Sequence, residues 1–122
     1  MLVKAVHTIP PLGGDVPTWR DELRSLPRAT TDGELRLLIG DFNATLDHHE
    51  LRALVASGYR DAADTAGVGL DGTYRVWLRL PLRIAIDHVL VDRRAHVTDA
   101  SVEPVPGSDH RALLTTLSLP AS

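Results

Sequence analysis

Asp87 is an acidic residue inside an otherwise apolar segment, Ile-Ala-Ile-Asp-His-Val-Leu-Val at positions 84–91. A carboxylate there is costly to bury unless a hydrogen-bond donor or a cation meets it. His110 is a suitable partner, because a carboxylate that accepts from one imidazole nitrogen fixes the tautomer and raises the pKa of the ring. The second nitrogen is then free to donate to an anion. The alternative is a simple ion pair of Asp87 with Arg83 or Arg111.

Further polar side chains stand directly beyond apolar segments, where strands of an α/β sheet would end. Loops at strand ends bring distant side chains into one pocket, so these residues are candidates for a shared site. Taken singly, each has a plainer explanation, because an aspartate after a glycine is often a turn residue or a helix cap, and Ser-Asp is an ordinary turn sequence. The candidates beside Asp87 and His110 are His7, Asp41, Asn43 and Asp109.

The composition indicates a single globular domain, residues 1–122, and excludes several kinds of site. Apolar residues make up 43% of the chain, enough for one core, and 122 residues are too few for two domains. The absence of cysteine excludes disulfides, thiolate zinc sites and cysteine nucleophiles. The net charge of -3 provides no basic footprint for nucleic acid. No apolar run approaches the roughly 20 residues that a membrane-spanning helix needs.

Apolar periodicity predicts an α/β domain in the order β, α, β, α, followed by several strands. The first helix is expected at residues 16–26, and the second has Asp47 as N-cap, Glu50 as its capping partner and Gly58 as its stop. A short helical turn is expected at 61–66. The terminal strands are expected to be antiparallel. The strands are predicted at 2–9, 35–39, 73–80, 84–91, 96–102 and 111–119.

Most of the polar candidates lie within short motifs, which are Ile-Gly-Asp-Phe-Asn-Ala at 39–44, Gly-Thr-Tyr at 72–74, Ile-Asp-His-Val-Leu-Val at 86–91 and Gly-Ser-Asp-His-Arg-Ala-Leu at 107–113. In sequence, order and spacing they resemble the endonuclease/exonuclease/phosphatase superfamily, the fold of DNase I, abasic-site endonucleases and neutral sphingomyelinases. His7 is similar to the histidine that precedes Gly-Asp-Phe-Asn in that family. The resemblance covers most of the chain, and the combination of Gly-Asp-Phe-Asn with Ser-Asp-His is highly specific.

The resemblance implies half of a DNase I-like four-layer sandwich, with one mixed sheet and helices on one face. In that family the domain is longer, and its N-terminal half supplies an asparagine and a glutamate that is a principal metal ligand. Neither motif occurs in this sequence. The chain is therefore expected to be the C-terminal half of such a domain, truncated or naturally half-length, with impaired activity when alone.

The resemblance also implies a metal-dependent phosphoesterase that hydrolyses a phosphate mono- or diester with activated water. Asp41 would orient or deprotonate that water. Asp109 would contribute to the metal site, because hard cations prefer carboxylate oxygens. Mg2+ is the expected ion, with Mn2+ as a substitute.

The phosphate group would be held by the remaining candidates. Asn43 would bind a phosphate oxygen through its amide hydrogens. His110, supported by Asp87, and His7 would donate to the nonbridging oxygens as negative charge builds on phosphorus. No covalent enzyme intermediate is expected.

The substrate class stays open among a nucleic acid, a nucleotide and a phospholipid headgroup. The missing basic face favours a small phosphodiester over duplex DNA. Two other interpretations remain. One is a noncatalytic dimerisation or scaffold module that retains the family residues, and the other is an unrelated α/β binding domain whose Asp and His residues are turns and core pairs.

Half of the family fold would leave one face of the sheet bare. Val3, Ala5, Leu37 and Ile39, with the apolar positions of 84–91, would then expose a patch larger than soluble monomers tolerate. We therefore expect a homodimer in which two copies stack these faces about a two-fold axis.

Overall fold

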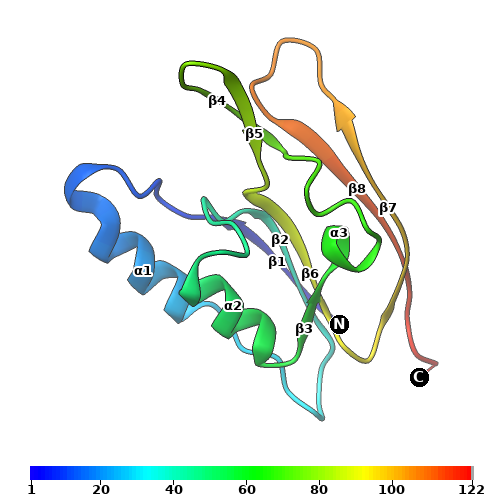
Figure 1. Ribbon diagram of the computed structural model, residues 1–122. Helices are drawn as coiled ribbons and strands as arrows, with labels where there is room; N and C mark the ends of the chain where they lie inside the picture. The colour runs from blue at the N-terminus through cyan, green and yellow to red at the C-terminus, as the bar shows by residue number, and fades with distance from the viewer. Residues whose placement is uncertain (122) are drawn as a thin grey trace.

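The computed structural model describes residues 1–121 of the chain (Figure 1). None of the described helices is long and apolar enough to cross a membrane. The strands are β1 (Leu2–His7), β2 (Arg36–Asp41), β3 (Tyr59–Asp61), β4 (Tyr74–Trp77), β5 (Pro81–Ile84), β6 (Asp87–Asp92), β7 (His96–Pro104) and β8 (Arg111–Ser118). The helices are a short 3-10 helix (Gly13–Asp15), α1 (Val16–Ser25), α2 (His49–Ala56) and α3 (Ala62–Thr65).

A mixed sheet forms the centre of the fold, with the strand order β1-β2-β6-β3. Strands β1 and β2 are parallel, whereas β6 runs antiparallel to both β2 and β3. The register pairs His7 with Asp41, and Asp41 with Asp87. Because these residues end β1, end β2 and begin β6, they stand in one row along the same edge of the sheet.

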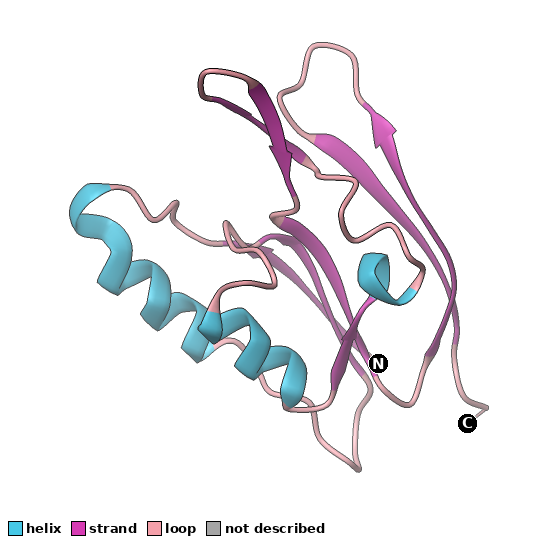
Figure 2. Ribbon diagram, viewed as in Figure 1, coloured by secondary structure: helices cyan, strands magenta, loops and turns pink. Residues whose placement is uncertain are grey.

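Both faces of the mixed sheet are covered (Figure 2). Helices α1 and α2 pack on one face, where Trp19 and Leu51 join Leu38 and Leu90 in a buried cluster. On the other face, α3 and the antiparallel β7–β8 hairpin cover a second cluster. The predicted mixed α/β class, in its α+β form, and the antiparallel terminal strands are thus confirmed. The second cluster consists of Leu37, Ala62, Val89, Val91 and Ala95, with Val97, Leu113 and Leu117 packed against it.

The prediction of a wholly bare sheet face is wrong for much of that face. Leu37, Val89 and Val91 are buried beneath the β7–β8 hairpin, because that hairpin folds back over the sheet instead of extending it. Val3, at 51% exposure, and Ile39, at 38%, remain open, as does Ala5. Within the mixed sheet, only the part of the predicted patch on the β1 side is exposed.

Several local predictions differ from the structure. Strand β3 was not predicted, and the single strand predicted at 84–91 is divided between the end of β5 and β6. The alternation expected to continue to residue 80 ends at Trp77, and the chain turns back as β5 to form a separate β4–β5 hairpin, with Leu78 and Leu80 exposed. The N-cap of α2 is His48 rather than Asp47. The Nδ1 atom of His48 accepts a hydrogen bond from the backbone N–H of Thr45, so the loop closes one residue later than the capping pattern suggested.

Gly40 allows β1 and β2 to approach each other beside the row of site residues. It has φ +144°, and a Cβ built on it would lie 2.0 Å from the Val6 carbonyl oxygen. We expect Gly40→Ala to destabilise the protein by about 1–3 kcal/mol, because β1 must move away from β2. Denaturant unfolding measures the loss, with Gly14→Ala, whose Cβ meets nothing within 4 Å, as the control. Equal midpoints for the two variants would contradict this prediction.

Candidate active site

The sheet edge brings His7, Asp41 and Asp87 together, and a fourth predicted residue joins them from another hairpin. His110 lies directly before β8 and forms an isolated antiparallel bridge with Tyr74 of β4. This bridge carries the imidazole to the first residue of β6. Residues that are distant in the sequence therefore meet at one end of the sheet.

Asp87 and His110 form the predicted pair. The Nδ1 atom of His110 lies 2.8 Å from Oδ2 of Asp87, so the carboxylate takes the imidazole rather than Arg83 or Arg111 as its partner. Burial lowers the pKa of His110, but the hydrogen bond and the charge of Asp87, with further charges nearby, outweigh it and hold the pKa above its ordinary value. The ring therefore carries a positive charge over a wider pH range than an ordinary histidine.

Asp41 faces both histidines. Its Oδ2 atom lies 3.8 Å from Nε2 of His110 and 3.9 Å from Nε2 of His7. Burial raises the pKa of Asp41, the backbone N–H of Asn43 lowers it, and the charge of Asp87 raises it again, with a net result above the ordinary value. Two carboxylates thus share a small space, an arrangement that favours binding of a proton or a cation.

Hydrogen bonds between backbone groups and side chains, including side chains from just after β1 and from α1, hold the loop after β2. The backbone N–H of Asn43 donates to Oδ1 of Asp41 at 2.8 Å, and its side-chain amide donates to the Thr8 carbonyl at 2.9 Å. The Phe42 carbonyl accepts from the Thr8 hydroxyl and from the Trp19 indole. Asn43 has φ +46°, a left-handed conformation that asparagine tolerates better than most residues. Asp41 and Asn43 are therefore fixed before any ligand arrives.

His88, for which sequence reasoning predicts no role, supports the same loop. It is 3% exposed, and its Nε2 lies 2.7 Å from the Ala44 carbonyl, while its Nδ1 lies 2.6 Å from Oδ2 of Asp61. Since both nitrogens face acceptors, the ring must donate from both, as an imidazolium does. Burial lowers the pKa of His88, but the Asp61 carboxylate, then the Ala44 carbonyl and the charge of Asp87, raise it above its ordinary value.

Thr73 positions the start of β6. Its side chain is buried, and its hydroxyl accepts from the backbone N–H groups of Ile86, at 3.1 Å, and Asp87, at 3.0 Å. The backbone N–H of Thr73 in turn donates to the Ile84 carbonyl. The Gly-Thr-Tyr motif thereby fixes the position of the Asp87 carboxylate.

The acid–histidine cluster, defined as Asp41, Asp87 and His110, has the composition of a cation site. One ligand atom from each residue lies within 4.8 Å of the others. The two carboxylates suit a hard divalent cation, which would offset both the burial of Asp41 and the charge of Asp87, the two causes that raise the pKa of Asp41. Asp109, the predicted metal ligand, follows Ser108 on an exposed turn and is not part of this cluster.

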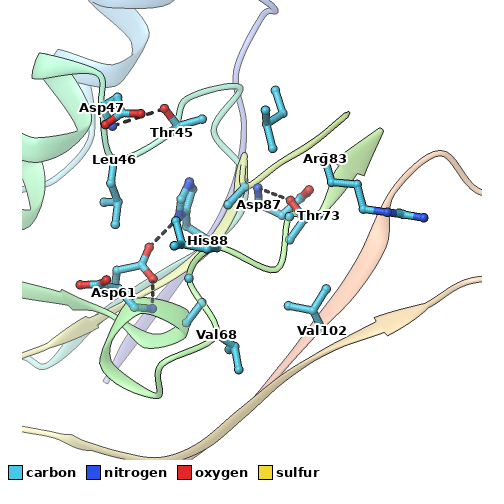
Figure 3. A pocket seen from close by; sticks show the side chains of 17 residues that line it. Thr45, Leu46, Asp47, Asp61, Val68, Thr73, Arg83, Asp87, His88 and Val102 are labelled. Carbon is cyan, nitrogen blue, oxygen red and sulfur yellow. Dashed lines mark hydrogen bonds and ion pairs between the residues drawn. The ribbon is translucent and has the colours of Figure 1, made fainter. Parts of the chain in front are cut away.

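Two hollows adjoin the cluster. One, of about 230 Å³, is lined by Asp87 and His88 together with apolar residues such as Val102 (Figure 3). The other, of about 360 Å³, is lined by Asp109 and His110 together with residues of the β4–β5 hairpin. The hydrogen bond between Asp87 and His110 therefore lies where the two hollows approach each other.

Comparison with known proteins agrees with this arrangement. A sequence profile described as the endonuclease/exonuclease/phosphatase family matches residues 3–110, which include every predicted site residue. No curated protein matches the sequence. The profile covers most of the chain, and so the chain belongs to the endonuclease/exonuclease/phosphatase family.

Proposed function

We propose that this chain hydrolyses a phosphate mono- or diester by attack of water, with the help of a divalent cation. The observation that carries the proposal is the Asp87–His110 pair, whose free Nε2 faces Asp41 at 3.8 Å. A charged imidazole beside a half-buried carboxylate provides both a donor for a phosphate oxygen and an acceptor for a proton of water. Membership of the family supports the same class of reaction.

In this proposal each residue has a defined task. Asp41 accepts a proton from the attacking water or orients it, aided by its raised pKa. His110, oriented by Asp87, donates through Nε2 to a nonbridging oxygen, and the exposed His7 donates from the neighbouring strand. Asn43 binds a further phosphate oxygen.

The divalent cation would be held by Asp109 and by carboxylate oxygens of Asp41 and Asp87, because His110, which donates from both ring nitrogens in this proposal, has no lone pair free for it. Mg2+ is the expected ion because the oxygen donors are hard, and Mn2+ would substitute for it. When bound, the cation would neutralise charge on the phosphate and polarise the ester. The cation affinity of the isolated chain is expected to be weak, because the family's glutamate motif is not found in this sequence.

The proposal is tested by hydrolysis of bis-p-nitrophenyl phosphate with Mg2+ or Mn2+. We expect release of p-nitrophenol that requires the metal, stops with a chelator and disappears in His110→Ala. His96→Ala, which removes an exposed histidine from β7, is the matched control and should keep the activity. Turnover that persists in His110→Ala would point to a contaminating enzyme. If neither the wild type nor the two variants released p-nitrophenol, the result would favour the noncatalytic scaffold.

A homodimer is the second part of the proposal, supported by the open β1 side of the sheet. Val3 and Ile39 are apolar and exposed there, and two copies related by a two-fold axis would cover them. We expect light scattering to give twice the mass of one chain, and Val3→Asp to restore the single mass. Leu70→Asp, at a residue that is 99% exposed elsewhere, is the control. A wild-type mass equal to one chain would rule out the dimer.

A further inference from the structure

Two arginines of the β4–β5 hairpin face each other although this arrangement is unfavourable. The register places Arg75 directly opposite Arg83. Like charges at directly opposite positions of an antiparallel pair destabilise a hairpin. The guanidinium of Arg75 lies 5.3 Å from the ring centre of Trp77, on the same hairpin, which offsets only part of this repulsion.

A third arginine adds positive charge at the same place. The backbone N–H of Arg111 donates to the Thr73 carbonyl, and that of Arg75 donates to the Asp109 carbonyl, so the start of β8 lies alongside β4. Desolvation, and then the positive charges of Arg111 and Arg75, lower the pKa of Arg83. The Nε atom of Arg111 is buried without a hydrogen-bond partner among the described residues.

These side chains line the hollow of about 360 Å³ that also contains His110. Asp109 is the acidic residue of its lining, against the three arginines. The chain as a whole has a net charge of -3, so this positive groove runs against the overall charge. One guanidinium nitrogen of Arg111 donates to the Asp71 carbonyl, but none of the three arginines forms an ion pair with a carboxylate among the described residues. A groove that gathers three such guanidinium groups fits an anionic ligand.

We propose that this arginine groove, formed by Arg75, Arg83 and Arg111, binds a second phosphate group of the substrate, next to the phosphate that is hydrolysed. The inference rests on the proposed function, because His110 lines the groove and is also assigned to the scissile phosphate. It narrows the substrate to phosphate esters that carry at least one additional phosphate. Guanidinium groups recognise phosphate through paired charge-assisted hydrogen bonds.

The second phosphate has two chemical sources, a nucleotide chain and a phosphorylated lipid headgroup. Trp77 is 70% exposed at the groove and offers a ring on which a nucleobase can stack. Two probes distinguish these sources, thymidine 3′,5′-bisphosphate and inositol 1,4-bisphosphate. Both carry two phosphates, but only the thymidine compound carries a base. Tighter binding of the nucleotide, lost in Trp77→Ala, would assign the groove to nucleotides, and equal binding would assign it to phosphate alone.

Binding is measured first, without metal and without turnover. Calorimetric titration with inorganic pyrophosphate is expected to show weak binding that Arg83→Gln weakens by about tenfold. Arg75→Gln should weaken pyrophosphate binding by a similar factor. Arg79→Gln, which removes an exposed arginine of the same hairpin outside the groove, should bind as the wild type does. Equal affinity in the Arg83→Gln and Arg79→Gln proteins, or no binding to the wild type, would overturn the inference.

Kinetics separates this inference from the proposed function. The p-nitrophenyl ester of thymidine 5′-phosphate, with and without a 3′-phosphate, differs by one phosphate group. We expect the added phosphate to lower KM in the wild type and in Arg79→Gln, whose arginine lies outside the groove, and Arg83→Gln to remove that advantage. Hydrolysis with no preference for the added phosphate would overturn the inference alone, whereas pyrophosphate binding without hydrolysis would overturn the proposed function alone.

The stability of the same variant distinguishes a ligand site from a structural role. Because Arg83 faces Arg75 across the hairpin, Arg83→Gln should leave the melting temperature unchanged or raise it. A structural role for Arg83 would instead predict a lower melting temperature together with weaker binding. Weaker pyrophosphate binding in a protein of undiminished stability is the expected result.

Discussion

Asp87→Asn is expected to lower the pKa of His110 and to reduce phosphodiester hydrolysis near neutral pH by about 10²- to 10³-fold, the usual cost of losing a positioned donor to a developing oxyanion. In the native protein, burial lowers the pKa of His110, and the hydrogen bond and charge of Asp87 more than restore it. Asparagine has nearly the same size, but it carries no charge. The ring therefore becomes neutral at a lower pH.

The direction of the pH dependence follows from this change. A neutral His110 places no positive charge beside the phosphate oxygens, whereas a protonated one does. The activity deficit of Asp87→Asn should therefore be greatest between the new and the native pKa of His110, and it should shrink as the pH falls through the new pKa or rises through the native one. If the Asp87→Asn substitution merely distorted the site, it would lower the activity by a similar factor at every pH.

The pKa change is measurable even if the isolated chain proves inactive. Nitrogen and carbon NMR shifts of the His110 ring, followed against pH in metal-free protein, report its titration directly. Asp21→Asn, at an exposed carboxylate of α1, is the matched control and should leave the titration of His110 unchanged. An unaltered His110 titration in Asp87→Asn would show that the carboxylate does not support the ring.

The pairing of Asp87 with His110 was predictable because a buried carboxylate must find a partner, and the apolar flanks of Asp87 signal its burial. The role of His88 was not predictable in this way. Its partners, Asp61 and Ala44, are 27 and 44 residues away in the sequence, and only the meeting of β3, β6 and the loop after β2 brings them to the ring. Neighbouring residues in the chain carry no sign of these contacts.

Periodicity predicted the helices and most strands, but it did not predict how hairpins fold onto the sheet. The alternation of Leu78 and Leu80 continues the pattern of β4 and conceals the turn into β5. Likewise, nothing in the apolar spacing of β7 and β8 indicates whether they extend the sheet or cover Leu37 and Val91. These choices depend on packing between distant segments, which local patterns do not encode.

Asp61→Asn is expected to destabilise the protein by about 3–5 kcal/mol at slightly acidic pH, the usual cost of removing one partner from a buried ion pair. The Asp61 carboxylate lies 2.6 Å from Nδ1 of His88, and both side chains are buried. Asp61 also caps α3, where its Oδ1 accepts from the backbone N–H of Asp64. Asparagine is an equally good cap, so the substitution removes the charge and keeps the helix start.

The difference in stability between the wild type and Asp61→Asn depends on pH, and the raised pKa of His88 determines its direction. Because the folded pKa of His88 is raised above the unfolded value of about 6.5, the pair contributes its full stability below that value. The contribution is lost as the pH rises through the folded pKa of His88. Wild type and Asp61→Asn should therefore differ most in mildly acidic solution and converge toward alkaline pH.

Urea unfolding of metal-free protein at a series of pH values measures this convergence. Asp64→Asn, at an exposed carboxylate in the first turn of the same helix, should change stability by no more than about 0.5 kcal/mol at any pH. A constant difference between wild type and Asp61→Asn would mean that His88 stays neutral in the fold. In that case one ring nitrogen would lack a proton for its acceptor, which contradicts the two short contacts to Asp61 and Ala44. Convergence, in contrast, would identify a buried imidazolium that holds the loop carrying Asp41 and Asn43.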